Sequence, residues 1–180
     1  MSQEWIIRVE NSADYESIDR VVIAASREEE TAQLVRDLRT HGDALLSLVA
    51  ESASSVVGHI MMSRALIEDA RGNIPAAALA PLMVDPAYQN KGIGSLLTRH
   101  ALQHCRLSGE TIVLVLGHPT YYPRFGFSAD LAQSLKIPFK PRVPGAYMAL
   151  ELKPGVLSGV TGRVMYPRAF GLAPEWTNHG

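Results

Sequence analysis

Two apolar runs frame a helical segment in the middle of this chain. Ala76–Val84 and Thr111–Leu116 are almost continuously apolar, as expected of strands that are covered on both faces. Between them, Gly92–Leu107 has the periodicity of a helix that ends at Gly109. A strand, a helix and a strand with short connections form a βαβ unit, whose strands lie parallel with a right-handed crossover. We therefore predict a parallel strand pair at the centre of the fold.

Shorter segments on both sides extend this unit into one α/β sheet with about seven strands and three or four helices. A polar turn at Glu51–Ser55 joins two of the added strands, and the turn Ala70–Asn73 precedes the central unit. The added strands are predicted at Trp5–Val9, Leu45–Ala50, Val56–Ile67, Tyr147–Leu152 and Gly162–Tyr166.

Two further helices are predicted between the first two strands. Ser12 can cap the first helix, and the second starts near Arg27 and leaves at Gly42. Their apolar positions recur at helical spacing and are expected to be buried. These positions are Ile18, Val21, Val22 and Ala25 in the first helix, and Leu34, Val35 and Leu38 in the second.

Composition limits the kinds of partner that this chain can bind. Its 180 residues fit one domain, and 47% hydrophobic with 19% charged residues is an ordinary globular balance. A net charge of −1 gives no basic field for nucleic acid or an anionic membrane. No segment reaches transmembrane length, and the single cysteine, Cys105, excludes an intrachain disulfide. We expect a cytoplasmic protein without nucleic-acid or membrane partners.

The connection between the first central strand and the helix has the composition of a phosphate-binding loop. The strand stops at Asp85-Pro86, because proline lacks the N–H that a ladder needs. Gly92 and Gly94 let the backbone approach a bulky anion, and Lys91 adds a positive charge. The sequence matches neither a dinucleotide fingerprint nor a Walker loop. We interpret this loop as a binding site for a pyrophosphate. The alternative is a helix start that contains two glycines and binds no ligand.

Two motifs follow the two central strands, Gln89-x-x-Gly92-x-Gly94 after the first and Tyr122-Pro-Arg-Phe-Gly126-Phe127 after the second. In their order and spacing, the first resembles the coenzyme A loop of the GNAT superfamily of N-acetyltransferases, and the second resembles a segment after the family's next strand. Leu34–Arg39 and the tail Gly159–Phe170 resemble the bacterial YhbS-like branch of this family. The resemblance spans residues 5–170 as a single domain and leaves 171–180 as a C-terminal tail.

The resemblance implies a GNAT-like mixed, mostly antiparallel sheet with a central βαβ unit that binds acyl-coenzyme A. It implies transfer of an acetyl group from acetyl-coenzyme A, as co-substrate, to a small-molecule or protein amine by direct attack in a ternary complex. The family's pantetheine contacts fall on the backbone of Leu82, Met83 and Val84. Its pyrophosphate contacts fall on the loop residues Gln89, Asn90, Lys91, Gly92, Ile93, Gly94 and Ser95.

The same resemblance assigns Tyr122 as the general acid that protonates the leaving thiolate. A packed aromatic residue is the alternative for Tyr122, and Tyr121 is the neighbouring candidate for the acid. The general base stays open, because Ala76–Val84 contains no carboxylate. His118 is a candidate for a proton relay through water, and His59 is equally compatible with a structural role.

The acidic segment after the first helix is expected to contribute to the acceptor site. The family lines this site with the corresponding segment, which implies that Glu28 and Glu30 attract a cationic amine. Ser26 and Glu29 have the spacing of a capping box, so we assign Glu29 to the helix start instead.

Other reactive residues receive structural interpretations. His100 and His104 have a metal-compatible spacing without a carboxylate, and we interpret them as surface residues, so no metal is expected. Cys105 is expected to be a helix-packing residue. Two non-enzymatic hypotheses remain open: an acyl-coenzyme A binding or regulatory module, and an interaction domain without a ligand. A monomer and a homodimer are both compatible with the sequence.

Overall fold

The computed structural model of this protein describes residues 5–178. The chain forms two compact units. The N-terminal unit comprises the chain up to Met62 together with Ala80–His104, and the C-terminal unit comprises Ser63–Leu79 and the chain from Cys105 onward. Two long strands and one helix contribute residues to both units, and each unit is described by itself below.

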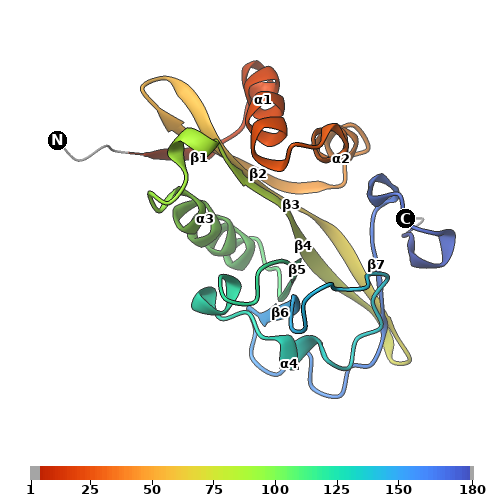
Figure 1. Ribbon diagram of the computed structural model, residues 1–180. Coiled ribbons are helices and arrows are strands. Elements are labelled where there is room, and N and C mark those ends of the chain that lie inside the picture. The colour runs from red at the N-terminus through yellow and green to blue at the C-terminus, as the bar shows by residue number, and fades with distance from the viewer. Residues whose placement is uncertain (1–4, 179–180) are drawn as a thin grey trace. The chain divides into compact units, whose positions relative to one another are not determined.

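Seven strands pair in the order β1-β2-β3-β4-β5-β6, with β7 also paired to β3 (Figure 1). β4 and β5 are parallel, with Ala77 opposite Val113, which confirms the predicted βαβ unit. The pairs β1–β2, β3–β7 and β5–β6 are antiparallel, so the predicted mixed, mostly antiparallel sheet is also confirmed. The strands are β1 Ile6–Val9, β2 Ala44–Ser52, β3 Ser55–Asp69, β4 Gly72–Val84, β5 Ile112–Leu116, β6 Tyr147–Glu151 and β7 Arg163–Met165.

In the N-terminal unit, helices α1 (Tyr15–Ser26) and α2 (Glu29–Thr40) pack against each other (Figure 1). Most of the predicted apolar positions on these helices are buried, but Ala25 and Leu34 are only partly buried. Both lie at the edge of their stripe, where a helix turns its side chains toward solvent. The fully buried positions are Ile18, Val21, Val22, Val35 and Leu38.

The two predicted helix caps are wrong. Asn11, one residue before Ser12, caps the first helical turn and forms a capping box with Asp14. Ser26 ends α1, and its hydroxyl bonds the backbone N–H and carbonyl of Glu28. Arg27 has a left-handed backbone with φ of 62°, so the chain reverses there and α2 begins only at Glu29. The side chain of Glu29 binds Arg36, and Ser26 and Glu29 form no capping box.

The predicted exit of α2 is confirmed. Gly42 has a φ of 74°, which a residue with a Cβ adopts only at a cost. The N–H of Asp43 then reaches back to the carbonyl of Leu38 at 2.9 Å, as in a Schellman motif.

Helix α3 (Ile93–Leu107) packs closely against β3 within the N-terminal unit. A Cβ atom built on Gly58 of β3 lies 3.1 Å from the side chains of both Ile93 and Leu97. These two residues and Ala101 are buried. The glycine therefore brings the first turn of α3 close to the sheet.

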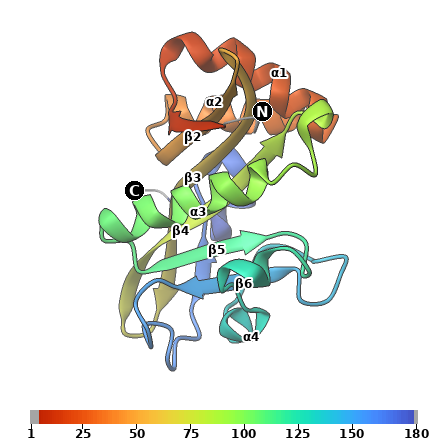
Figure 2. The same cartoon turned by 90° about the vertical axis from the view of Figure 1, so that its left-hand side faces the viewer.

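In the C-terminal unit, the short helix α4 (Ala129–Ala132) lies beside β6 (Figure 2). The buried hydroxyls of Tyr147 on β6 and Tyr166 after β7 are 2.7 Å apart. Thr177 pairs with Tyr166 through an isolated bridge, and its side chain is buried. The last described residues are therefore part of the packed C-terminal unit.

Candidate functional site

The loop between β4 and α3 is fixed at its start by backbone and carboxylate hydrogen bonds. The N–H of Asp85 donates to the carbonyl of Val57 on β3 at 2.9 Å. The carboxylate of Asp85 accepts from the N–H of Ala87, which starts a short 3-10 turn over Pro86–Tyr88. The chain therefore leaves the sheet at a defined residue, which agrees with the predicted stop at Asp85-Pro86.

The backbone then turns twice through the left-handed region before the helix begins. Asn90 has a φ of 60° and Gly92 a φ of 86°. The first backbone bond of α3 runs from the N–H of Leu96 to the carbonyl of Gly92 at 3.0 Å. The N–H groups of Ile93, Gly94 and Ser95 thus lie in the first turn, where a helix offers them no carbonyl. Such a turn binds an anion through its N–H groups and the helix dipole.

Two side chains of the loop make hydrogen bonds inside it. The amide of Gln89 donates to the carbonyl of Val84 at 3.0 Å, which ties the loop to the end of β4. The ammonium of Lys91 donates to the carbonyl of Ala87 at 3.2 Å and lies 5.1 Å from the ring centre of Tyr88. Gln89, Asn90, Lys91 and Gly92 are all exposed. The loop is therefore shaped from within while its outer surface stays accessible.

The end of β4 extends beyond its paired register with β5. The parallel register joins Ala77–Leu79 to 113–115, and Pro81 has no N–H to add to the ladder. Leu82, Met83 and Val84 follow and are partly buried. These are the strand residues to which the family resemblance assigns the pantetheine contacts.

Tyr122 lies in the turn after β5, in the C-terminal unit. It begins a 3-10 turn over Tyr122–Phe125, and its side chain is 7% exposed. Its ring meets those of Tyr121 and Phe127 edge to face, with centroids 5.0 and 5.5 Å away. Burial, followed by the neighbouring Tyr121, raises the pKa of Tyr122 well above that of an exposed tyrosine. The phenol therefore stays protonated at neutral pH, as a proton donor requires.

Tyr121 differs from Tyr122 in the environment of its hydroxyl. The hydroxyl oxygen of Tyr121 is buried and has no hydrogen-bond partner among residues 5–178. Its ring packs against Phe125, and the guanidinium of Arg124 lies 4.6 Å from the ring centre. Leaving a buried hydroxyl unpaired costs free energy, so this hydroxyl does not stabilise the fold.

His59, which the sequence left undecided, belongs to a buried polar network in the N-terminal unit. Its Nε2 lies 2.8 Å from the hydroxyl of Ser47, which donates to Glu10 at 2.6 Å. Arg39 binds both oxygens of Glu10, at 2.8 and 2.9 Å. Burial lowers the pKa of His59 to about 4, although the nearby Glu10 opposes this shift. His59 is thus a neutral core histidine, and no local pattern in the sequence linked it to Glu10, Ser47 or Arg39.

The acidic segment is exposed at the start of α2. Glu28 occupies the N-cap position, and its carboxylate accepts from the hydroxyl of Thr31 at 3.5 Å. Glu30 is exposed in the first turn of the helix. Glu29 pairs with Arg36, which also binds Asp19 at 2.7 Å. Glu29 is therefore held on the helix surface by an ion pair, whereas Glu28 and Glu30 have no ion-pair partner among residues 5–178.

The remaining candidates have structural positions. Cys105 is buried, and burial raises its pKa to about 11, which agrees with a packing role. His104 and His118 are exposed and His100 is partly buried. Within residues 5–178, no cluster of three or more His, Cys, Asp or Glu side chains could hold a metal ion. Within the same range, no helix has the length and apolar character needed to cross a membrane.

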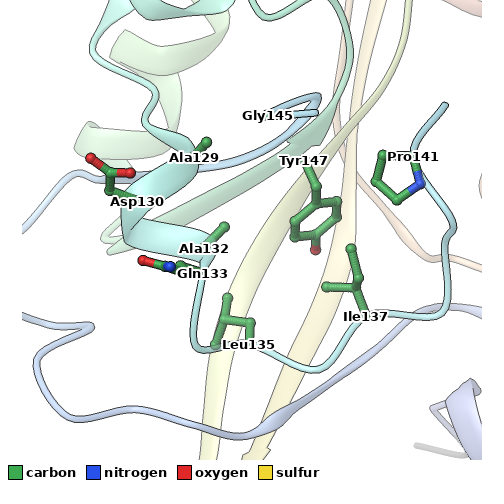
Figure 3. Close-up of a pocket in the computed structure, with 9 residues that line it drawn as sticks. All are labelled: Ala129, Asp130, Ala132, Gln133, Leu135, Ile137, Pro141, Gly145 and Tyr147. Atoms are coloured by element: carbon green, nitrogen blue, oxygen red, sulfur yellow. The ribbon is translucent and has the colours of Figure 1, made fainter. Parts of the chain in front are cut away.

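The C-terminal unit also contains a pocket that the sequence did not indicate (Figure 3). Its volume is about 450 Å³, and Leu135, Ile137 and the ring of Tyr147 give it an apolar wall. Asp130 and Gln133 add polar groups. None of the residues predicted for the cofactor, the acid or the acceptor lines this pocket.

Comparison with known proteins assigns the chain to a family. The acetyltransferase (GNAT) domain family matches residues 43–129. YhbS of Escherichia coli K12, an uncharacterized N-acetyltransferase, is 32% identical over 167 residues, which cover 92% of this chain and 98% of YhbS. This chain belongs to the GNAT family of acetyltransferases. A second relative, the uncharacterized N-acetyltransferase YjhQ of Escherichia coli K12, is 39% identical over 68% of this chain and 69% of YjhQ.

Solved structures of GNAT proteins have the same fold. The crystal structure of YhbS from Escherichia coli in complex with CoA superposes with a TM-score of 0.86 at 30% identity, covering 95% of this chain and 94% of YhbS. A GNAT family acetyltransferase from Brucella melitensis in complex with acetyl-CoA has a TM-score of 0.77 at 31% identity, covering 93% of this chain and 99% of that protein. The predicted GNAT fold is thereby confirmed.

Proposed function

We propose that this GNAT protein binds acetyl-coenzyme A and transfers its acetyl group to an amine by direct attack, with both substrates bound together. The observation that carries the proposal is the start of α3, where exposed left-handed turns at Asn90 and Gly92 precede first-turn N–H groups that the helix itself cannot pair. Apart from its two chain neighbours, no atom of residues 5–178 lies within 4 Å of a Cβ built on Gly92, so a bulky anion has room beside the loop. The similar structures from Escherichia coli and Brucella melitensis hold CoA and acetyl-CoA, which supports the same ligand here.

Ten residues would hold the co-substrate. The backbone N–H groups of the loop and the charge of Lys91 suit its pyrophosphate. The backbone of β4 after Pro81 suits an extended, amide-containing arm. The loop residues are Gln89, Asn90, Lys91, Gly92, Ile93, Gly94 and Ser95, and the strand residues are Leu82, Met83 and Val84.

Tyr122 would act as the general acid. When bound, the thioester would supply an activated acetyl group to the neutral amine, which has first lost its ammonium proton to solvent. A C–N bond forms to give a tetrahedral oxyanion, and the C–S bond then breaks. The hydroxyl of Tyr122 gives its proton to the sulfur, and the second proton that the amine loses returns to the phenolate through water. Burial keeps Tyr122 protonated until this step, because it disfavours the phenolate.

The acceptor is proposed to be a cationic amine attracted by the exposed carboxylates of Glu28 and Glu30. A small molecule and a protein amine both fit this chemistry. The second candidate function is a non-catalytic acyl-coenzyme A binding module. One observation favours it: β4 contains no Asp or Glu that could serve as a general base beside the loop.

Release of free coenzyme A from acetyl-coenzyme A, measured across a panel of small amines and amine-bearing peptides, tests the proposal. We expect release that depends on both the amine and the enzyme, and a Gly94→Val variant should show none. Tight binding of acetyl-coenzyme A without release for any amine would favour the binding module. Absence of binding would reject both functions.

A further inference from the structure

The ring of Tyr122 occupies the space that a side chain at position 117 would need. A Cβ atom built on Gly117 overlaps Cε2 of Tyr122 and lies 2.9 Å from Cδ2 and 3.3 Å from Cζ, which carries the hydroxyl. Gly117 is not among the residues with positive φ, so any residue could adopt its backbone conformation. The glycine is therefore required for space, at the hydroxyl end of the ring.

The backbone around Gly117 is held on both sides and cannot easily move away. The N–H of Gly117 donates to the carbonyl of Ala146 at 2.9 Å, which continues the β5–β6 ladder by one residue. The carbonyl of His118 accepts from the N–H groups of both Tyr121 and Tyr122, at 3.0 and 3.3 Å. A side chain at position 117 would therefore displace the Tyr122 ring rather than the main chain.

The ring is also bounded by other aromatic side chains. Tyr121 and Phe127 meet it edge to face, and Phe127 is itself buried. A ring pushed away from Gly117 must rotate about its side-chain torsions, because close-packed neighbours leave little room to slide. Rotation about the Cα–Cβ bond moves the hydroxyl farther than any other atom of the side chain, since the hydroxyl lies at the end of the ring. Rotation about the Cβ–Cγ bond leaves the hydroxyl on its axis, but the edge-to-face contacts with Tyr121 and Phe127 oppose such a turn of the ring.

We propose that Gly117 is a positioning residue for acetyl transfer, because its missing side chain lets the Tyr122 hydroxyl take the place from which it donates its proton. The inference rests on the proposed function, in which Tyr122 is the acid. No contact with either substrate is assigned to Gly117. A glycine needed only for packing would change stability without acting through the hydroxyl of Tyr122, and this difference can be measured.

A double-mutant cycle on kcat provides the test. Gly117→Ala is expected to lower kcat by on the order of 10²-fold, as small displacements of catalytic groups do, with little change in the KM for acetyl-coenzyme A. In the Tyr122→Phe background, where no hydroxyl remains to be placed, Gly117→Ala is expected to leave kcat unchanged. An unchanged kcat in the single Gly117→Ala variant overturns the inference, and so does an equal loss in both backgrounds.

A thermal-unfolding cycle tests the steric relationship on which the inference depends, and it can be measured even if Gly117→Ala is destabilised. The added methyl group is expected to lower the Tm of the wild type but not that of Tyr122→Ala, because the smaller side chain frees the space. Equal losses of Tm in both backgrounds would reject the steric relationship. Failure of the proposed function is seen separately: if Tyr122→Phe alone keeps the wild-type kcat, Tyr122 is not the acid. If Tyr122→Phe loses activity and Gly117→Ala does not, only the positioning inference fails.

Discussion

The Nε2 atom of His59 lies 2.8 Å from the hydroxyl oxygen of Ser47, at a point where the histidine ring is completely buried. The hydroxyl donates to Glu10, whose carboxylate is also bound by Arg39. Burial opposes the ionisation of Glu10, but the hydrogen bonds from Arg39 and Ser47 outweigh it and keep the pKa of Glu10 below its usual value. The network therefore holds a neutral histidine beside a charged carboxylate.

The buried, neutral His59 predicts that the protein loses stability in mild acid. The pKa of His59 is about 4 in the folded protein, compared with 6.5 for an exposed histidine. Between these two pH values, His59 is protonated in the unfolded chain but not in the folded protein. The free energy of unfolding should then decrease by about 1.4 kcal/mol per pH unit between the two values. Denaturant unfolding should show this slope in the wild type and a flatter curve in His59→Gln. The exposed His41 offers a control, and equal slopes in His41→Gln and His59→Gln would contradict the assignment.

Binding of acetyl-coenzyme A should stabilise the protein, because a ligand that binds only the folded state shifts the unfolding equilibrium. At a hundredfold excess over Kd the gain is about 2.7 kcal/mol. Gly94→Val should remove this gain, since a branched side chain in the first turn of α3 blocks the approach of a phosphate. Gln103→Ala, on an exposed position of the same helix, should keep it. Calorimetry showing wild-type affinity in Gly94→Val would place the pyrophosphate elsewhere.

Tyr122→Phe should lower kcat by on the order of 10²–10⁴, the usual contribution of a general acid, while the affinity for acetyl-coenzyme A is preserved. Tyr121→Phe is the matched control, because the two residues are adjacent and their rings are in contact. Its hydroxyl is buried and has no partner in the described part of the chain, so we expect its removal to leave both kcat and stability near wild type. If Tyr121→Phe is the inactive variant, the acid role belongs to Tyr121.

Glu30→Gln should raise the KM for a cationic amine and leave the Tm unchanged, because its carboxylate is exposed at the start of α2. Glu29→Gln should leave KM unchanged and reduce stability by no more than about 1 kcal/mol, the range for exposed ion pairs such as that with Arg36. Steady-state kinetics on an accepted amine, with unfolding curves of both variants, separates the two effects. A raised KM in Glu29→Gln alone would reverse the assignment.

The hydroxyl pair of Tyr147 and Tyr166 predicts a non-additive effect on stability. Tyr147→Phe leaves the hydroxyl of Tyr166 buried without its 2.7 Å partner, which should cost about 1–3 kcal/mol. Adding Tyr166→Phe removes the second polar group, so the double variant should be more stable than the sum of the two single losses. Denaturant unfolding of the three variants measures this coupling, and strictly additive losses would argue against the pair.

The sequence predicted the central part of the fold because its signals there are local. The apolar runs of β4 and β5, and the exits at Gly42 and Gly109, depend on neighbouring residues alone. The start of α2 was predicted wrongly for a different reason. Arg27 adopts a left-handed conformation that is unusual for arginine, and the chain reverses there. Because of this reversal, Ser26 and Glu29 do not form the capping box that their spacing predicts.

In the candidate site, too, local features could be predicted from the sequence, whereas contacts between distant segments could not. The loop from Gln89 to Ser95 could be proposed from glycine spacing and family resemblance, since an anion site there would depend on the loop's own backbone. The network around His59 joins four segments, and the space under Tyr122 depends on a glycine five positions earlier. Neither relationship leaves a periodic or compositional signal, because both arise from packing between segments.

Cys105 bears directly on how this protein can be studied. It is the single cysteine of the chain, it is 3% exposed, and burial raises its pKa to about 11. Reagents that detect thiols react with the thiolate, so the folded protein should contribute almost no background to a colorimetric assay of released coenzyme A. Any slow labelling of the enzyme itself then reports how often the part of helix α3 around Cys105 opens to solvent.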